Sequence, residues 1–200
     1  CILASMDRYS NFDQLDKNER RGTDYDIRIQ DLGSAITLAA PHGGRIEPGT
    51  SIVARLAAGS IFNYYCFEGI KPKNNAALHI TSHLFDEPRG LELFSASAVV
   101  VTIHASKDRD RVIYIGGRHR ELAGSIRNSL VSTGVDLPEE SGRYPGMHPD
   151  NICNRGTLKK GVQIEISRGI RDDFHMRYRV ADAVKQALIL FRQSSGIPFR

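Results

Sequence analysis

Two histidines and a glutamate are spaced so that they could surround a single metal ion. His42 follows the apolar run SAITLAAP, Glu47 comes five residues later, and His104 lies at the end of the run SAVVVTIHA. Two imidazoles and one carboxylate, with a fourth position left for water, form a common catalytic zinc site. The sequence therefore predicts one zinc ion held by His42, Glu47 and His104.

The stretch PHGGRIEP, which carries His42 and Glu47, has to form a loop if both residues bind one ion. On a helix their side chains would point about 140° apart, at ~100° per residue, whereas Gly43 and Gly44 allow a tight turn. The alternative is an ordinary glycine-rich turn between a strand and a helix. Five other histidines remain competitors as ligands: His79, His83, His119, His148 and His175.

A second carboxylate, Glu165, lies within the apolar run GVQIEIS. An unpaired carboxylate is costly to bury, so we interpret Glu165 as a general base for the attacking water, its pKa tuned by the metal and by partial desolvation. Polar and apolar residues alternate along this run, and the alternative is therefore an acid that faces solvent from a half-buried strand.

Four arginines, which follow predicted strand ends or lie in the irregular stretch over residues 135–160, could bind a negatively charged substrate. Each one alone is most simply a surface charge. Together they offer fixed donors for carboxylates and one for an oxyanion. They are Arg118, Arg155, Arg168 and Arg171.

The scaffold that positions these residues is predicted from short runs rich in β-branched and aromatic residues. They predict strands at residues 25–32, 34–40, 61–67, 77–85, 97–105, 111–117 and 161–167. Helical spacing of apolar residues predicts helices over 50–59, 120–134 and 172–196. Ligand sites of such sheets lie at the carboxyl ends of strands, and His42, His104, Arg118 and Glu165 all fall at or near predicted ends.

Strands that alternate with helices predict an α/β fold: a single domain over residues 25–200, with a mixed, mostly parallel sheet flanked by helices. Residues 1–24 are polar and are expected to form a docked N-terminal arm with a short helix. Residues 135–160 are irregular and rich in proline and glycine, and we interpret them as a functional loop.

Composition narrows the classes of partner. The 27 lysines and arginines are interspersed with 23 acidic residues, for a net charge of +4, which favours a local basic site over a nucleic-acid-binding tail. No apolar run is long enough to cross a membrane. Three cysteines are too few for a disulfide framework, although a Cys66–Cys153 bridge stays open if the protein is exported. The chain starts at Cys1, which fits processing or trimming.

Six segments, in this order, carry a family resemblance: PHGGRIEPGTS, LHITSHLFDEP, TIHAS, IYIGGR, NICNRG and GVQIEIS. Together they resemble the bacteriophage and Bacillus poly-γ-glutamate hydrolases, zinc enzymes that cut the γ-glutamyl amide bonds of the poly-γ-glutamate capsule. The resemblance implies a zinc carboxypeptidase-like fold, zinc on His42, Glu47 and His104, and a catalytic Glu165. Carboxypeptidases space their first two ligands as His-x-x-Glu, so the longer loop found here cannot be copied from them.

In the implied mechanism, Glu165 takes the proton of the attacking water and passes it to the departing amine. Arg118 is expected to contact the oxyanion or a substrate carboxylate, and Asn151, Arg155 and Arg168 to bind neighbouring carboxylates. We expect an extracellular monomer, secreted or released on phage lysis, that acts on poly-γ-glutamate without a nucleic-acid partner. The alternatives are a zinc amidase for another γ-glutamyl or cell-wall amide, and a non-catalytic polyanion-binding module.

Overall fold

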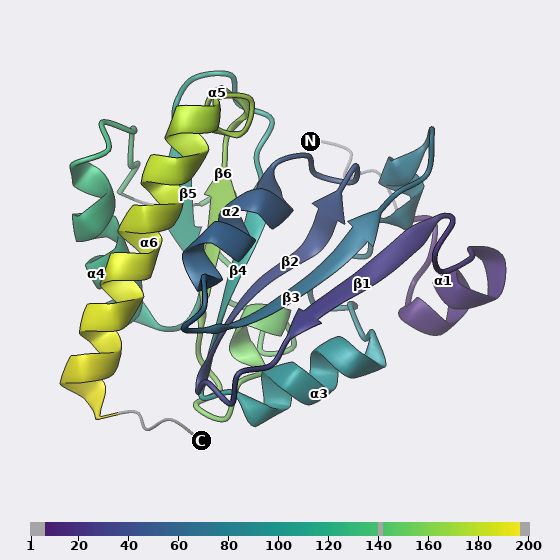
Figure 1. The fold of residues 1–200 in the computed structure, drawn as a ribbon, viewed down its shortest axis with the longest axis horizontal. Coiled ribbons are helices and arrows are strands. Elements are labelled where there is room, and N and C mark those ends of the chain that lie inside the picture. Colours follow the sequence, from purple (N-terminus) through teal and green to yellow (C-terminus); the bar gives the residue numbers. More distant parts are fainter. Residues whose placement is uncertain (1–6, 140–141, 197–200) are drawn as a thin grey trace.

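A six-stranded mixed sheet forms the centre of the computed structural model, which describes residues 7–139 and 142–196 (Figure 1). The strands are β1 (Tyr25–Gln30), β2 (Ile36–Gly44), β3 (Asn63–Gly69), β4 (Val99–Ala105), β5 (Ile113–Gly116) and β6 (Val162–Ile166). Their order across the sheet is β1-β3-β2-β4-β6-β5. The four central strands are parallel, and the strand at each edge is antiparallel to its neighbour. This confirms the predicted α/β fold with a mostly parallel sheet.

Helices cover both faces of the sheet. They are α1 (Phe12–Asn18), α2 (Thr50–Ala58), α3 (Pro88–Ala96), α4 (Arg120–Val131), α5 (Arg168–Arg171) and α6 (Phe174–Ser195), with short 3₁₀ helices η1 (Asn75–Leu78) and η2 (Ile152–Asn154). Helices α2, α4 and α6 share one hydrophobic core with the sheet. On the other face, α1, α3 and the segment after η1 contribute to a second core that is rich in aromatic residues.

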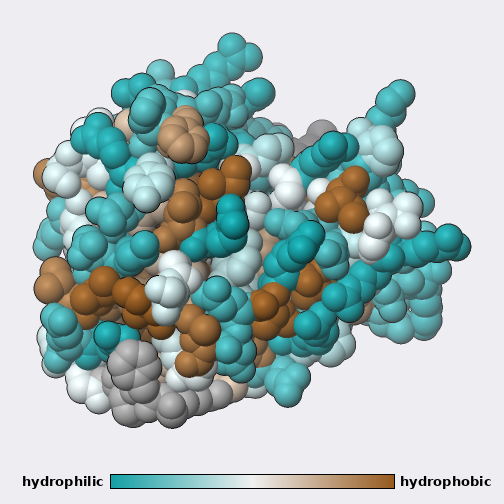
Figure 2. Space-filling model, viewed as in Figure 1, coloured by the Kyte–Doolittle hydropathy of each residue, from teal (hydrophilic) through white to brown (hydrophobic). Residues whose placement is uncertain are grey.

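The outer surface of the α2 and α6 face is mixed in character. Figure 2 shows hydrophilic residues over much of this view, with hydrophobic side chains in separate groups between them. Along the part of the chain that the structure describes, no helix combines the length and the apolar character needed to span a membrane.

The predicted strand over residues 77–85 is wrong. This segment starts in η1 and continues as turns, and its Ile80 and Phe85 are buried in the second core without joining the sheet. Helix α3 was not predicted. Its start is nevertheless encoded locally, because Pro88 occupies the first turn and the Glu87 carboxylate accepts hydrogen bonds from the backbone N–H groups of Arg89 and Gly90.

The burial of β6 decides between the two interpretations of its alternating pattern. All five of its residues are buried, and Glu165 is only 6% exposed. The apolar residues of β6 face the α6 side, so Gln163 and Glu165 face the second core. Glu165 is therefore not a solvent-facing acid.

Candidate active site

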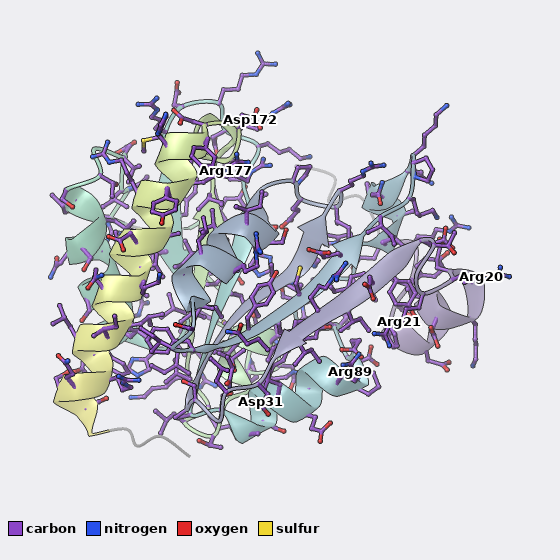
Figure 3. All side chains as sticks on the ribbon, viewed as in Figure 1. Arg20, Arg21, Asp31, Arg89, Asp172 and Arg177 are labelled. Atoms are coloured by element: carbon purple, nitrogen blue, oxygen red, sulfur yellow. The ribbon has the colours of Figure 1, made fainter. Side chains whose placement is uncertain are left out.

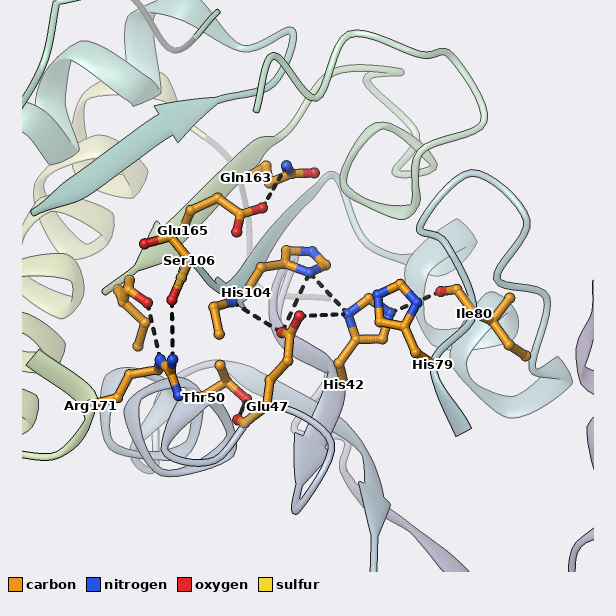
Figure 4. Close-up of polar contacts among 12 residues, drawn as sticks. His42, Glu47, Thr50, His79, Ile80, His104, Ser106, Gln163, Glu165 and Arg171 are labelled. Carbon is orange, nitrogen blue, oxygen red and sulfur yellow. Dashed lines mark hydrogen bonds and ion pairs between the residues drawn. The ribbon is translucent and has the colours of Figure 1, made fainter. Parts of the chain in front are cut away.

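Three parallel strands deliver polar side chains to the carboxyl edge of the sheet, the upper edge in Figure 1. His42 lies near the end of β2, within a register shift between Ala40 and Gly43. His104 lies near the end of β4 and is in register with Glu165 of β6. Because neighbours in register point to the same face of a sheet, the side chains of His104 and Glu165 lie side by side (Figure 4).

His42, Glu47 and His104 form a compact cluster of donor atoms. His104 Nδ1 lies 3.3 Å from His42 Nδ1. Glu47 Oε1 lies 3.5 Å from His42 Nδ1, and the other carboxylate oxygen, Oε2, lies 4.0 Å from His104 Nδ1. In a tetrahedral zinc site with metal–ligand distances of about 2.0–2.1 Å, neighbouring ligand atoms are about 3.3 Å apart. The cluster has nearly this geometry.

Hydrogen bonds and burial prepare both imidazoles to bind a cation. His42 Nε2 lies 2.8 Å from the Ile80 carbonyl oxygen, so Nε2 carries the proton and donates it, which leaves the Nδ1 lone pair facing the cluster. Burial and the neighbouring His42 lower the pKa of His104 to about 3 and keep it neutral. His104 Nε2 is buried and has no hydrogen-bond partner in the described parts of the chain.

The electrostatics of the cluster favour a positive charge between His42 and Glu47. Burial acts against ionisation of both groups, yet the Glu47 carboxylate raises the pKa of His42, and His42 in turn lowers the pKa of Glu47. The second Glu47 oxygen accepts a hydrogen bond from the Ala105 backbone N–H at 3.0 Å, which ties the loop to the end of β4. A divalent metal would supply the charge that this arrangement favours.

A fourth imidazole, His79, lies against the cluster. Its ring packs on the His42 ring with centroids 4.0 Å apart, and its Nδ1 lies 2.7 Å from the Asp7 carboxylate. Ligand atoms of His42, Glu47 and His79 all lie within 4.8 Å of one another, so this group could also hold a metal. The sequence marked His79 only as one of several competitors, because its segment carried the pattern of a strand.

Two hydrogen-bonded side-chain amides hold Glu165 in place. Gln163 Nε2 donates to Glu165 at 3.0 Å, and Asn151 Nδ2 donates to Gln163 Oε1 at 2.8 Å. Burial and the nearby Glu47 charge raise the pKa of Glu165 well above its ordinary value, in the direction that suits a general base at neutral pH. Asn151 was predicted to bind substrate. Its buried side chain is instead committed to Gln163 and to the Cys153 backbone N–H.

Arg171 joins the three segments that carry the site. Its buried guanidinium donates to the carbonyl oxygens of Pro48 at 2.7 Å, Ser106 at 3.1 Å and Ile166 at 3.1 Å. These carbonyls come directly after Glu47, two residues after His104 and directly after Glu165. Figure 4 shows Arg171 below this cluster, on the side away from His79. Arg171 thus fixes the segment that carries Glu47 (residues 45–48, the metal loop) relative to the ends of β4 and β6.

Two predicted arginines lie elsewhere. Strand β5 is antiparallel to β6, with Gly116 opposite Gln163. The chain therefore leaves β5 at the amino-terminal ends of the parallel strands, away from the carboxyl ends that carry the cluster. Arg118 therefore does not join His42, His104 and Glu165. It lines a separate groove together with Arg155, whose guanidinium donates to the carbonyl oxygens of Asp150 and His83. The strand-end argument failed for Arg118 because the direction of β5 was not predicted.

Arg168, the remaining predicted substrate-binding residue, lies at the start of α5 on the side of the metal loop. It is exposed and pairs with Asp172 at 3.2 Å. It lines a depression together with Pro48 and Arg171. Arg168 and Arg171 are thus the two predicted arginines that the structure brings near the cluster.

The two glycines after His42 were predicted to lie in a loop, but they form the end of β2 and have different physical roles. Gly44 has a φ of 61°, a left-handed conformation that favours glycine. Gly43 does not have a positive φ, but a Cβ added there would lie 2.2 Å from Cys66 Sγ. Gly43 is thus required by close packing against β3. The Cys66–Cys153 disulfide is not formed, since both cysteines are free and buried.

Comparisons with known proteins show the family of the chain. A family model described as poly-gamma-glutamate hydrolase matches residues 9–193. The SPbeta prophage-derived UPF0714 protein YoqZ of Bacillus subtilis (strain 168) is 36% identical over 182 residues, which cover 90% of this chain but only 65% of YoqZ. The chain therefore spans slightly less than two thirds of that relative.

Two solved structures have the same fold over nearly their whole length. One is described as the structure of a bacteriophage poly-gamma-glutamate hydrolase, with a TM-score of 0.90 and 30% identity; the match covers 94% of this chain and 99% of that one. The other is described as YndL-apo (zinc-free), with a TM-score of 0.82 and 33% identity; the match covers 94% of this chain and 98% of that one.

Proposed function

The chain belongs to the poly-gamma-glutamate hydrolase family, and on that premise we propose that it cleaves the γ-glutamyl amide bonds of poly-γ-glutamate with one zinc ion. One observation carries the proposal: His42, Glu47 and His104 place donor atoms 3.3–4.0 Å apart, with a buried carboxylate on the adjacent strand. Membership of a hydrolase family decides against a non-catalytic polyanion-binding module.

Zinc fits this donor set. The set combines one carboxylate with two imidazoles that can be neutral, and these are ligand types that catalytic zinc prefers. We assign the third position to His104 because its Nδ1 meets the spacing that a tetrahedral site needs. His79 packs against the ring of His42 and is fixed through Nδ1 by Asp7, where it could contact water or substrate. The bound ion would polarise the scissile carbonyl and lower the pKa of water.

Glu165 is the proton carrier of the reaction. It takes a proton from the water whose oxygen bonds to the carbonyl carbon, and it delivers that proton to the amine nitrogen when the carbon–nitrogen bond breaks. The hydrogen bond from Gln163 fixes the direction of the carboxylate. Asn151 acts through Gln163 as a positioning residue.

The substrate and the setting follow from the same chemistry. Each residue of poly-γ-glutamate keeps a free α-carboxylate, so the polymer is a polyanion that a chain with net charge +4 attracts. Arg168 remains a candidate contact for these carboxylates. Because capsule polymer lies outside the cell, we place the activity outside the cell as well, with the protein acting as a monomer.

Incubation of the purified protein with poly-γ-glutamate, with and without a chelator, tests the proposal. We expect shortening of the polymer that the chelator prevents, about one zinc per chain, and no cleavage of α-linked polyglutamate. Glu165→Gln should abolish turnover and keep its zinc. Cleavage of a cell-wall amide in preference to the γ-linked polymer would favour the alternative amidase, and retained activity of Glu165→Gln would remove Glu165 from the mechanism.

The third ligand is tested by comparing two histidine variants. His104→Ala should lose stoichiometric zinc, whereas His79→Ala should retain it and lose turnover. Metal analysis after dialysis reads this out directly. The reverse result would assign the third position to His79.

A further inference from the structure

A basic depression opens beside the metal loop. It encloses about 480 Å³, within the size range of small-ligand sites. Its lining comes from the segments that follow Glu47, His104 and Glu165, the same three that carry the candidate site. The lining residues are Pro48, Lys107, Arg109, Arg168, Arg171 and Asp172. Figure 3 labels Asp172 beside α5, at the carboxyl edge of the sheet.

Four of these six residues are cations and only one is an acid. Asp172 is paired with Arg168 at 3.2 Å. Arg171 donates to backbone carbonyls and makes no ion pair with a described carboxylate, although Glu47 and Asp172 are near enough to act on its charge. Within residues 7–139 and 142–196, Lys107 and Arg109 make no ion pair. The depression therefore presents uncompensated positive charge and suits carboxylates, which guanidinium groups bind as two-pronged donors.

The carboxylate between Lys107 and Arg109 does not cancel this charge. Asp108 accepts a hydrogen bond from Arg143 at 3.0 Å, and its pKa lies below its ordinary value because hydrogen bonds outweigh burial. Arg143 also packs over the ring of Tyr114 on the neighbouring strand β5. Asp108 is thus occupied by a cation from outside the depression, while Lys107 and Arg109 on either side of it are exposed.

The distance from the cluster matches the repeat of the proposed substrate. Lys107 is three residues beyond His104, so their Cα atoms are at most about 11 Å apart, at 3.3–3.6 Å per residue. A γ-linked repeat has five backbone bonds and spans roughly 6 Å when extended. The depression therefore lies within about two repeats of the cluster, in reach of a residue beyond the two that flank the scissile bond.

We propose that this depression is a subsite for the α-carboxylate of a poly-γ-glutamate residue beyond the two that flank the bond that is cut. The inference rests on the proposed function and deepens it. Lys107 and Arg109 supply the free charges, Arg168 adds a donor at the rim, and Arg171 gives the floor a fixed charge. Longer substrates fill the subsite and a γ-linked dimer does not.

Binding of γ-linked glutamate oligomers of two and ten residues to zinc-loaded Glu165→Gln protein tests the subsite. Each exposed ion pair is worth at most about a factor of five in affinity. Because Lys107→Ala and Arg109→Ala together remove two such pairs, they should weaken binding of the decamer about tenfold. Binding of the dimer and the zinc content should not change. Salt should weaken decamer binding less steeply in this variant.

Arg118→Ala is the matched control, because it removes one cation at the opposite edge of the sheet. An equal loss in Arg118→Ala, or undiminished decamer binding by the Lys107→Ala, Arg109→Ala protein, would overturn the subsite. The proposed function is judged separately on protein with Glu165 intact. If that protein does not shorten the polymer, both proposals fail; if it does and decamer binding is unaffected, only the subsite fails.

Discussion

Removal of the Arg171 side chain should damage the metal site and the fold together. The carbonyl oxygens of Pro48 and Ser106 accept from Arg171 and from no other donor in the described chain, whereas the Ile166 carbonyl also accepts from the Ser106 backbone N–H. Ser106 is buried, so Arg171→Ala leaves its carbonyl unpaired at about 1–3 kcal/mol, whereas the carbonyl of the exposed Pro48 can turn to water. This cost is a substantial part of the about 5–15 kcal/mol that stabilises a typical domain.

Urea unfolding of the metal-free protein measures this cost, and chelator competition measures the zinc dissociation constant. We expect a lower unfolding midpoint with an unchanged slope, and weaker zinc binding because the Glu47 loop is no longer tied to the ends of β4 and β6. Arg171→Lys should recover only part of the stability and of the zinc affinity, because an ammonium group cannot reach three carbonyls at once.

Arg168→Ala on the same short helix is the control, because an exposed pair with Asp172 is worth about 1 kcal/mol or less. The reasoning is refuted if Arg171→Ala unfolds within about 1 kcal/mol of wild type and binds zinc equally well. A loss of stability with unchanged zinc affinity would limit Arg171 to a structural role.

Three further predictions concern the site and its loop. Burial and Glu47 raise the pKa of Glu165 above 4.5 in the folded state, so ionisation of Glu165 destabilises the metal-free fold as pH rises. Glu165→Gln should therefore have a higher melting temperature than wild type at pH 8 and the same melting temperature at pH 4. An equal difference in melting temperature at both pH values would contradict this. Gly43→Ala should cost about 1–3 kcal/mol by contact with Cys66, and unfolding of the double variant with Cys66→Ala should show partial recovery rather than additive losses. Zinc at a thousandfold excess over its dissociation constant should stabilise wild type by about 4 kcal/mol; a melting temperature that neither zinc nor chelator moves would argue against the site.

The sequence predicted the parts of the site that depend on local pattern. The runs before His42 and His104 and around Glu165 have the β-branched composition of buried strands, and the parallel arrangement brings their carboxyl ends together. Once the strands were placed, the strand-end rule was enough to bring these residues to one edge. The helices over residues 50–59, 120–134 and 172–196 were predicted for the same local reason.

Features that depend on long-range contacts were not predictable in this way. The direction of β5 is set by its pairing with β6 and not by its own residues, which is why Arg118 was misplaced. His79 reaches the cluster because Asp7, more than seventy residues away, accepts its hydrogen bond. The role of Asn151 appears only when Gln163 and Glu165 are seen beside it. A single sequence contains no local signal for any of these pairings.

The three hydrogen bonds that Arg171 donates also affect the stage of synthesis and folding at which the site can form. His42 and Glu47 leave the ribosome long before Arg171, which is the last part of the site to be synthesised. Contacts between residues so far apart in sequence form late in folding, because the intervening chain must first be ordered. The complete site, with the Glu47 segment tied to the ends of both strands, therefore requires the chain through α5.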